Sequence, residues 1–587
     1  MHILGINTGL NSSAILMKDN KIVFGIQEER LSKIKNQPGF PTLSIQAALK
    51  AGGITLDQVD KVCVAGKSSK IPHSRNEDLN KFHDRYGEIK KIWFGDRENI
   101  FAKLAQKGLQ KFAHAEKKEN IKKLDDYLEE YHLTSKHERF DHHLCHASSA
   151  YYGLAENKND KYLIFSLDGG GDGRTSAVYI GHENKLEEIA ASDSFSPACL
   201  YAHITYIMGF MPHEHEYKLM GLAPYAQPKY ADIAKEMLYQ FIGFSDENPL
   251  VFTNTPKYQD LRNSGSPQKQ QLIHDLYKSV LGVRFDTLSA GLQLLAEEVA
   301  IKWVKAGIKQ TGIKKVLLTG GFFMNVKANK LISEIPEVEF VNAFPSCGDE
   351  SNAFGAAFLG YQKLRKENSP EIVFEGCCVG TEATFDIEEA MNKYKDKVSF
   401  EKVADINGKV VELLIARKIV ARCSGKMEFG ARALGNRSIL ASPDDMRIIN
   451  KINAAIKKRD FWMPFAPASM EDKLDLVVDV PNSLKKSYSP YMMFTFDVKP
   501  AMYDKIVAGI HQADKTARAQ TVSQKIYPEF YDIISKFFQK TGIPTVLNTS
   551  FNLHGFPIVQ GACDAIDVYL NSELDVLVVG NYLITRK

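Results

Sequence analysis

The chain opens with MHILGINTGLNSSAILMKDNKIVFGIQ, residues 1–27, and this stretch decides the fold. An apolar run is followed by small polar residues and then by two further apolar runs around Asp19-Asn20, which is a turn signal. Short runs rich in isoleucine and valine and bounded by turns are typical of β-strands. We expect three strands, at residues 2–6, 13–17 and 21–26.

A second stretch repeats this pattern. Residues 162–180 read YLIFSLDGGGDGRTSAVYI, so an apolar strand at 162–167 runs through a glycine-rich turn into another strand at 175–180. A strand followed directly by a hairpin, with small polar residues between them, resembles the beginning of actin-like and hexokinase-like ATPase domains. Two such openings predict an α/β fold, a duplicated ATPase domain made of two similar halves.

The rest of the chain completes this domain and adds a second one. Ser289 is expected to cap a helix whose apolar face is Leu292, Leu295, Val299 and Trp303. A strand at 316–318 and a helical run at 351–366 follow, and the chain turns polar near residue 370. The second, smaller α/β domain has apolar runs of its own, at residues 418–421, 546–547 and 576–579. We therefore expect two domains, residues 1–370 and residues 376–587.

Composition excludes several classes of protein. A chain of 587 residues is longer than one core usually supports, which favours two to four domains. A net charge of +3 gives no argument for nucleic acid, and no stretch approaches the ~20 apolar residues of a membrane span. We expect neither partner, and we expect the Lys-, Glu- and Leu-rich residues 85–138 to form exposed helices. Eight scattered cysteines without a CxxC pair favour a reducing, cytoplasmic setting.

The sharpest local signal is a pair of histidines, His142 and His146, in FDHHLCHA. On a helix these positions share one face, and two imidazoles so placed can bind one metal ion. The same spacing also fits two partly exposed helix histidines, and a metallopeptidase is disfavoured because the glutamate of HExxH is missing. Asp168 follows an apolar strand and Asp349 precedes a helix, positions where aspartate is also a common turn or cap residue. Two imidazoles and two carboxylates together would suit iron, manganese or zinc.

Two glycine loops form the second signal. Gly169-Gly170 and Gly320-Gly321 each follow a strand, and glycine lets backbone N–H groups approach phosphate oxygens closely. Either loop alone is a common turn. At matching points of a duplicated fold, the two loops predict a nucleotide clamped between the halves, with Asn325 reaching its ribose or base.

The third signal is a set of basic and amide side chains in the second domain. KMEFGARALGNRS, residues 426–438, spaces cations among glycine and other small residues, and arginine suits bidentate contact with phosphate. Ordinary surface charge is the alternative. We predict a site for a small, doubly charged anion beside a triphosphate. Its candidate residues are Lys426, Arg432, Asn436, Arg437, Lys457, Arg459, Arg518, Asn548, Ser550 and Asn552.

Several motifs in one order resemble the carbamoyltransferase family that includes the nodulation-factor and antibiotic O-carbamoyltransferases. The motifs span almost the whole chain: EERLSKIK (28–35), HHLCHA (142–147), EYKLMGLAPY (216–225), GGFFMN (320–325), EFGARALGNRS (428–438) and NTSFN (548–552). The resemblance implies a first domain like the tRNA threonylcarbamoyl transferase, itself an actin-like ATPase fold. It implies a second domain like the threonylcarbamoyl-adenylate synthase.

The resemblance also implies a two-step reaction. The second domain would make carbamoyl-adenylate from carbamoyl phosphate and ATP, with Mg, releasing phosphate and pyrophosphate. The first domain would transfer the carbamoyl group to a hydroxyl of a sugar or natural product, where Fe(II), or Mn or Zn, holds the adenylate phosphate. By position, the family's metal ligands fall on His142, His146, Asp168 and Asp349. Its catalytic contacts with carbamoyl phosphate and nucleotide fall on Arg432, Lys457 and Arg518. A homodimer is one expectation for the assembly.

Three positions depart from the family's pattern. Leu10 stands where the family usually carries a histidine, Ala431 replaces a proline before Arg432, and Met463 replaces an arginine. These changes motivate an alternative, a divergent ATP-binding protein without transfer activity. A further alternative, tRNA threonylcarbamoyl modification, is disfavoured by the weak net charge.

The acceptor is expected to bind near residues 195–260, which are polar and rich in aromatic side chains. The alternative for this segment is a structural insertion. Its candidate contacts are Glu216 and Lys218.

Overall fold

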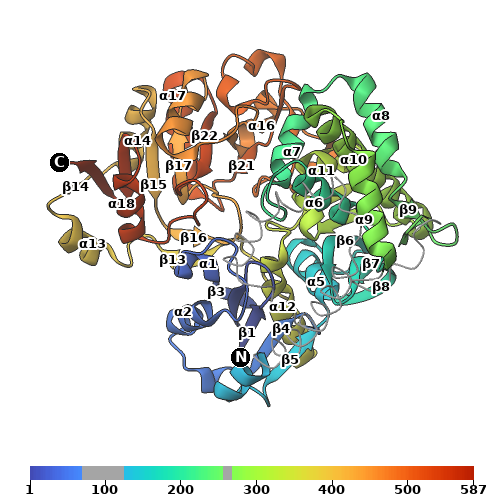
Figure 1. Cartoon of the computed structure of the whole chain (residues 1–587). Helices are drawn as coiled ribbons and strands as arrows, with labels where there is room; N and C mark the ends of the chain where they lie inside the picture. Colours follow the sequence, from blue (N-terminus) through green and yellow to red (C-terminus); the bar gives the residue numbers. More distant parts are fainter. Residues whose placement is uncertain (69–123, 256–266) are drawn as a thin grey trace, which may run out of the picture.

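The computed structural model describes residues 1–68, 124–255 and 267–587 (Figure 1). A five-stranded sheet near the amino terminus has the order β3-β2-β1-β4-β5. Strands β1, β2 and β3 pair antiparallel with one another. Strand β4 pairs parallel with β1, and β5 pairs parallel with β4. The strands are β1 (His2–Asn7), β2 (Ser13–Lys18), β3 (Lys21–Gln27), β4 (Lys61–Ala65) and β5 (His137–Phe140).

A second five-stranded sheet repeats this topology strand for strand, in the order β8-β7-β6-β11-β12. Its three antiparallel strands are again consecutive in sequence, and its last two strands are again added in parallel. The strands are β6 (Tyr162–Gly171), β7 (Arg174–His182), β8 (Lys185–Ser192), β11 (Lys315–Thr319) and β12 (Phe340–Ala343). The shared order and directions confirm the predicted duplication and the actin- and hexokinase-like α/β fold.

Two helices cross between the halves. Helix α5 (His142–Leu154) leaves the first sheet and packs on β6, β7 and β11, whereas α12 (Asn352–Leu364) leaves the second sheet and packs on β1, β2 and β4. The helices also contact each other where Gly355 lies so close to Cys145 that a Cβ at residue 355 would be 1.8 Å from the Cys145 carbonyl oxygen. This close crossing brings together the segments that begin the two helices.

The long helix α10 (Phe285–Thr311) covers the second half. Its predicted apolar face is confirmed, because Leu292, Leu295, Val299 and Trp303 are all buried. The prediction that Ser289 begins it was wrong. The helix starts earlier, after Arg284, and Ser289 lies buried inside it because the apolar face already includes Leu288. Neighbouring helices are α6 (Pro197–Ile207), α7 (Glu216–Leu222), α8 (Pro228–Tyr239), α9 (Pro267–Ser279) and α11 (Val326–Ser333).

The C-terminal part contains an eight-stranded sheet of order β14-β24-β23-β15-β17-β22-β18-β21. Its strands are β14 (Val398–Lys402), β15 (Val420–Cys423), β17 (Arg437–Ala441), β18 (Ala466–Met470), β21 (Gln520–Val522), β22 (Thr545–Ser550), β23 (Val576–Val579) and β24 (Tyr582–Arg586). The packed helices are α14 (Ile406–Ile415), α17 (Pro528–Thr541) and α18 (Ala562–Leu570). The sheet confirms the predicted α/β class of this part, which is drawn in orange and red in Figure 1.

The two parts share a core. The rings of Phe354 in α12 and Phe429 in the C-terminal part lie 4.9 Å apart, edge to face, and both belong to one cluster of buried apolar side chains. The predicted boundary near residue 370 stays a prediction. Residues 85–123 of the expected exposed helices lie outside the described residues. Among the helices that the structure describes, none has the length and apolar character needed to cross a membrane.

Candidate functional site: a His/Asp cluster and a cationic cluster

The amino-terminal end of α5 presents two histidines. The carboxylate of Asp141 accepts a hydrogen bond from the backbone N–H of Leu144 at 3.1 Å and thereby fixes where the helix begins. His142 and His146 then lie one turn apart on one face, with ring centroids 4.8 Å apart. Both are buried, and Nε2 of His142 has no hydrogen-bond partner within the described residues. An unpaired, buried imidazole nitrogen of this kind is a ready metal ligand.

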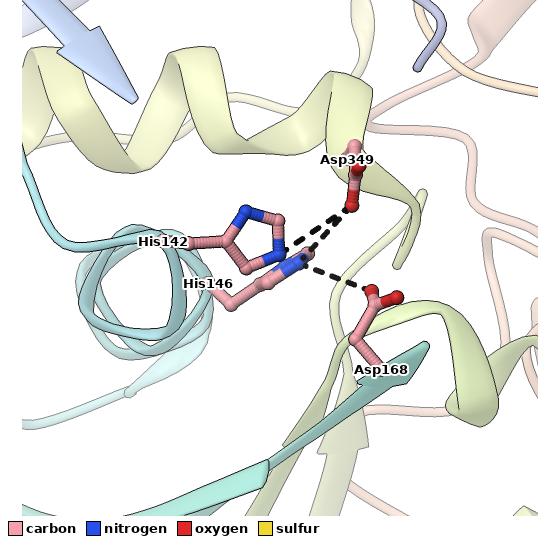
Figure 2. A group of neighbouring side chains, drawn as sticks. All are labelled: His142, His146, Asp168 and Asp349. Carbon is pink, nitrogen blue, oxygen red and sulfur yellow. Dashed lines mark ion pairs between the residues drawn. The ribbon is translucent and has the colours of Figure 1, made fainter. Parts of the chain in front are cut away.

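Two carboxylates face these imidazoles (Figure 2). Asp168 belongs to β6, and Asp349 begins the short turn η5 (Asp349–Ser351) before α12. Nε2 of His146 lies 3.3 Å from Oδ2 of Asp168 and 3.7 Å from Oδ1 of Asp349. Nε2 of His142 lies 3.6 Å from the same Asp349 oxygen. One ligand atom of each residue lies within 4.8 Å of the others, so the structure brings together all four predicted metal ligands.

This donor set fits a divalent transition metal. Two imidazole nitrogens and two carboxylate oxygens suit iron, manganese or zinc, and their spacing accommodates an ion with bonds of about 2.0–2.2 Å. Burial disfavours the charged forms of these groups. Hydrogen bonding and charge attraction outweigh it, raising the pKa of His146 to about 9 and holding the pKa of Asp168 well below its usual range. An imidazolium at His146 therefore balances the carboxylates in the metal-free protein.

Asp172 supports the cluster, and the sequence analysis did not single it out. Its Oδ2 accepts the backbone N–H groups of His142 and Lys67, at 2.8 and 2.9 Å, and its Oδ1 accepts that of Ser68 at 2.6 Å. The adjacent Gly171 lies against the His142 ring, where a Cβ would be only 2.2 Å away. The available signal was the second aspartate of the glycine-rich DGGGDG run.

The glycine loops lie beside this cluster. Gly169 and Gly170 are exposed, but the backbone N–H of Gly169 donates to Oδ1 of Asp168 and its carbonyl oxygen accepts from Sγ of Cys199 at 3.3 Å. Gly320 has φ of 91° and passes so close to Leu167 that a Cβ would be 2.3 Å from its carbonyl oxygen. The backbone N–H of Gly321 donates to Oδ2 of Asp168 at 2.9 Å. The Gly320-Gly321 loop therefore orients a carboxylate of the cluster, which the phosphate-binding prediction did not anticipate.

The side chain of Asn325 is bound within the fold. Its Oδ1 accepts the Ala328 backbone N–H at 3.1 Å and caps α11, and its amide exchanges hydrogen bonds with Gln293 at 3.0 and 3.1 Å. Asn325 therefore caps α11 and is fixed by Gln293, and its predicted contact with a ribose or base stays a prediction.

A cationic cluster forms in the C-terminal part. Burial and nearby Arg459 lower the pKa of Arg432 to about 10. Burial together with Arg432 and Arg459 lowers the pKa of Arg518 well below its usual range. The Nε groups of Arg432 and Arg518 have no hydrogen-bond partner among the described residues. Like charges held together without partners mark a site for an anion.

Lys457 belongs to the same cluster. Its Nζ donates to Oγ of Ser550 at 3.1 Å and to Oδ1 of Asn552 at 2.7 Å. Burial, with Arg459 and Lys35 nearby, lowers its pKa well below the usual range. Arg459 itself donates to the hydroxyl of Thr549 at 3.0 Å, a contact that the sequence analysis missed although it named the flanking residues. Neutral oxygens therefore orient these cations, and the described residues supply them with no carboxylate.

Comparison with known proteins decides the family. Residues 2–358 match the family described as "Carbamoyltransferase N-terminus", and residues 411–586 match "Carbamoyltransferase C-terminus". The chain belongs to the carbamoyltransferase family. It is 32% identical to an uncharacterized protein of Methanocaldococcus jannaschii over 100% of this chain and 99% of that protein. It is 30% identical to nodulation protein NolO of Bradyrhizobium diazoefficiens over 76% of this chain and 79% of that protein.

Nodulation protein NolNO of Sinorhizobium fredii is a further relative, 28% identical over 98% of this chain and 79% of that protein. Among solved structures, component A of the (R)-2-hydroxyglutaryl-CoA dehydratase of Acidaminococcus fermentans matches 62% of this chain and 98% of its own. Its TM-score is 0.33 and its identity 14%. We base the fold on the strand order of the two sheets instead.

Several side chains that were predicted to contact an anion bond main-chain oxygens of the carbamoyltransferase. The Arg437 guanidinium donates to main-chain oxygens of Ser424, Gly425, Thr381 and Gln560, at 2.8–3.0 Å. Asn436 bonds the Lys426 carbonyl oxygen at 2.7 Å, and Asn548 bonds that of Ala433 at 3.1 Å. Lys426 is exposed. The Arg437 guanidinium is thus bound by main-chain oxygens around it, and its predicted contact with an anion stays a prediction.

The predicted acceptor contacts lie on α7. Oε1 of Glu216 accepts the His213 backbone N–H, and burial raises the pKa of this carboxyl. Lys218 points toward the C-terminal part, where its Nζ lies 3.0 Å from Oδ2 of Asp460. Tyr217 between them influences the pKa of Arg432, Arg459 and Arg518, so α7 faces the cationic cluster. Tyr217 was not predicted, although it lies in a quoted motif.

The three departures from the family's pattern have different surroundings. The carbonyl oxygen of Leu10 accepts from the Asn7 side chain at 3.3 Å, and adjacent Gly9 lies beside Asp349. Ala431 is exposed. Sδ of Met463 packs against Gly221 of α7, 2.8 Å from where a Cβ would be. Met463 therefore fills a contact between the two parts of the carbamoyltransferase.

Proposed function

We propose that this carbamoyltransferase catalyses ATP-dependent O-carbamoylation in two steps. Carbamoyl-adenylate would form at the cationic cluster, and its carbamoyl group would pass to a hydroxyl of a sugar or other natural product at the His/Asp cluster. The observation that carries the proposal is the group of four cations, Arg432, Lys457, Arg459 and Arg518, without a carboxylate partner among the described residues. Like charges held this close repel one another, and a bound anion would offset that repulsion.

The first step consumes two phosphate substrates. Water converts carbamoyl phosphate to carbamate and phosphate. A carbamate oxygen attacks the α-phosphorus of Mg-ATP, and the bond from that phosphorus to pyrophosphate breaks. Arg432, Arg459 and Arg518 supply charge-assisted hydrogen bonds to these anions, and Lys457 adds a point charge oriented by Ser550 and Asn552. The cluster lowers the barrier by stabilising charge on the phosphoryl oxygens.

In the second step, the acceptor's hydroxyl oxygen attacks the carbamoyl carbon, the bond from that carbon to AMP breaks, and the hydroxyl proton is released. His142, His146, Asp168 and Asp349 would hold the divalent metal, for which Fe(II), Mn and Zn are the candidates. Such an ion supplies charge neutralisation on the adenylate phosphate. The exposed Gly170 follows two residues after Asp168, and its backbone would approach the same phosphate.

A cytoplasmic setting is part of the proposal. All eight cysteines are described and none forms a disulfide. Five of them are buried, and burial raises the pKa of each thiol, which keeps them unreactive: Cys63, Cys145, Cys347, Cys377 and Cys423.

The test is adenylate formation in the absence of acceptor. The purified protein is incubated with carbamoyl phosphate, Mg-ATP and Fe(II), and pyrophosphate and carbamoyl-adenylate are quantified by mass spectrometry. Wild type and Arg447→Ala, an exposed arginine of the same part, should give both products, whereas Arg432→Ala should give neither. Folded wild type that binds ATP but yields no adenylate would overturn the proposal.

The departures at Leu10 and Met463 favour a second candidate, a protein that binds ATP without transferring a carbamoyl group. Asn11 does not replace a histidine as a base, because an amide does not accept a proton near neutral pH. ATP hydrolysis to ADP that is independent of carbamoyl phosphate would support this second candidate.

A further inference from the structure

Gly430 lies two residues before Arg432, and both of its backbone polar groups are bound by the N-terminal part. Its N–H donates to Oε1 of Gln27 at 2.9 Å. Its carbonyl oxygen accepts a hydrogen bond from Nη2 of Arg30 at 2.6 Å. All of these contacts are buried, and they join residues 400 or more positions apart in the sequence. The main chain leading to Arg432 is therefore fixed by side chains of another part of the molecule.

The backbone conformation at Gly430 favours glycine. Gly430 has φ of 102°, which side-chain-bearing residues rarely adopt. A Cβ at this position would also lie 2.7 Å from Cβ of Ser346, in the segment that leads to Asp349. The loop is therefore pressed against the N-terminal part, and its path is set by that contact.

The two binding side chains are themselves fixed. Gln27 ends β3, and Arg30 lies in the short helix α1 (Glu28–Ser32) that follows. Nη2 of Arg30 also donates to Oε1 of Gln27 at 3.2 Å, and Nη1 lies 3.3 Å from Oε1 of Glu29. Gln27 and Arg30 are each 1% exposed and Glu29 is 5% exposed. Side chains buried this completely, and bonded to one another, have little freedom to move.

The far side of the same loop is held within the C-terminal part. Oε1 of Glu428 accepts the backbone N–H groups of Leu434, Asn436 and Arg437, at 2.8, 2.7 and 3.1 Å. Arg432 thus lies on a loop held at both ends. One end is held by its own part of the chain, and the other is held by Gln27 and Arg30.

We infer that Gln27 and Arg30 are positioning residues for Arg432, so that the anion site of the C-terminal part is completed by the N-terminal part. The inference rests on the proposed function for its effect on catalysis, but only on the cationic cluster for its effect on anion binding. Loss of either contact lets the loop move, and displacement of a guanidinium by about 1 Å is enough to weaken a bidentate contact severely.

The probe is inorganic phosphate, titrated into the full-length protein by calorimetry, together with the KM for carbamoyl phosphate. Gln27→Met is the main variant, because it keeps the volume, adds no charge and removes the acceptor for the Gly430 N–H. We expect phosphate affinity to fall and the KM to rise roughly 10- to 100-fold. Gln27→Glu retains an acceptor and should recover much of the loss. Arg30→Met is the second variant, should Gln27→Met melt below the assay temperature.

Arg365→Met is the matched control. Like Arg30, Arg365 donates to a glutamine three residues earlier, Gln362, and to one main-chain oxygen, that of Ser369. It should leave phosphate affinity and the KM unchanged.

A double-mutant cycle separates positioning from general destabilisation. If Gln27 acts through Arg432, Gln27→Met should cause no further loss of phosphate affinity in an Arg432→Ala background. Additive losses, or unchanged phosphate affinity in folded Gln27→Met, would overturn the inference. A wild type that binds phosphate but forms no adenylate would remove the proposed function, and the phosphate titrations would still decide the role of Gln27 and Arg30.

Discussion

The backbone N–H of Gly321 donates to the carboxylate of Asp168 at 2.9 Å. This bond ties the loop after β11 to the neighbouring strand β6 at the point where β6 reaches the two histidines of α5. The same Oδ2 lies 3.3 Å from Nε2 of His146, so the Gly321 N–H helps to hold this carboxylate oxygen toward the imidazole. Partners of this kind tune a metal site almost as strongly as the ligands themselves.

His146→Gln should remove metal binding and transfer while leaving adenylate formation intact. The substitution deletes the imidazole whose Nε2 faces both carboxylates, at 3.3 Å from Asp168 and 3.7 Å from Asp349. We expect the affinity for Fe(II), Mn or Zn after reconstitution to fall by roughly 100-fold. Metal content by elemental analysis and the two half-reactions measured separately provide the check. His143→Gln is the control, because His143 is not one of the four clustered residues and its Nδ1 bonds Oγ of Ser166 at 2.8 Å. Full metal occupancy in His146→Gln would show that His146 is not a metal ligand.

Metal affinity should rise with pH. The carboxylates raise the pKa of His146 to about 9 in the metal-free protein, so an ion must displace a proton from that imidazole. Below pH 9 the fraction of neutral His146 grows as pH rises, and the apparent dissociation constant should fall about tenfold per pH unit, levelling off above pH 9. Competition against a chelator of known pH dependence, between pH 6 and 9, measures this slope. A flat profile would show that His146 is already neutral.

The sequence predicted the fold well because its signals are local. The strand and hairpin openings at residues 1–27 and 162–180 depend on apolar runs and turns, and both appear with the same topology in the two sheets. The start of α10 was misplaced because a polar residue at position 289 looks like a cap, whereas the structure buries it. A cap is distinguished from a buried serine only by packing.

The candidate site was predictable in its residue types but not in its roles. Spacing placed His142 and His146 on one face, but only the crossing of α5 and α12 brings Asp349 to them. Arg432 and Arg437 lie five positions apart in one glycine-rich motif, yet Nε of Arg432 has no partner among the described residues, whereas the Arg437 guanidinium is bound by main-chain oxygens. Composition is the same in both cases, and tertiary contacts decide the role.

Arg437→Met should destabilise the protein strongly. The side chain is fully buried, and its loss leaves carbonyl oxygens of Ser424, Gly425, Thr381 and Gln560 without their donor. Each unpaired buried group is costly, so the free energy of unfolding should fall by about 3 kcal/mol or more. Denaturant unfolding measures the loss. A stable Arg437→Met protein with weakened phosphate affinity would show that Arg437 contacts the anion.

Asn325→Ala should reduce stability without changing the KM for ATP. The substitution removes the cap of α11, which contributes about 1 kcal/mol, and it leaves the Gln293 amide without its partner. Thermal unfolding and ATP titration of the same preparation separate the two effects. If the KM for ATP rises at a temperature where the variant is fully folded, the result would favour the nucleotide contact that the sequence predicted.

Arg518→Met should abolish adenylate formation and leave the ligand-free protein as stable as wild type, or more stable. Burial, together with the nearby Arg432 and Arg459, lowers the pKa of Arg518, and its Nε has no partner among the described residues. Removing this charge therefore relieves both the cost of burying it and the repulsion within the cluster. Added phosphate or carbamoyl phosphate should raise the thermal midpoint of wild type through binding to the folded state, and should raise that of the variant much less. Arg447→Met, whose exposed side chain pairs with Asp445, should respond to phosphate as wild type does. A large drop in the thermal midpoint of ligand-free Arg518→Met would contradict this prediction. It would mean that Arg518 stabilises the ligand-free protein, and that an anion does not act by relieving repulsion among the cations.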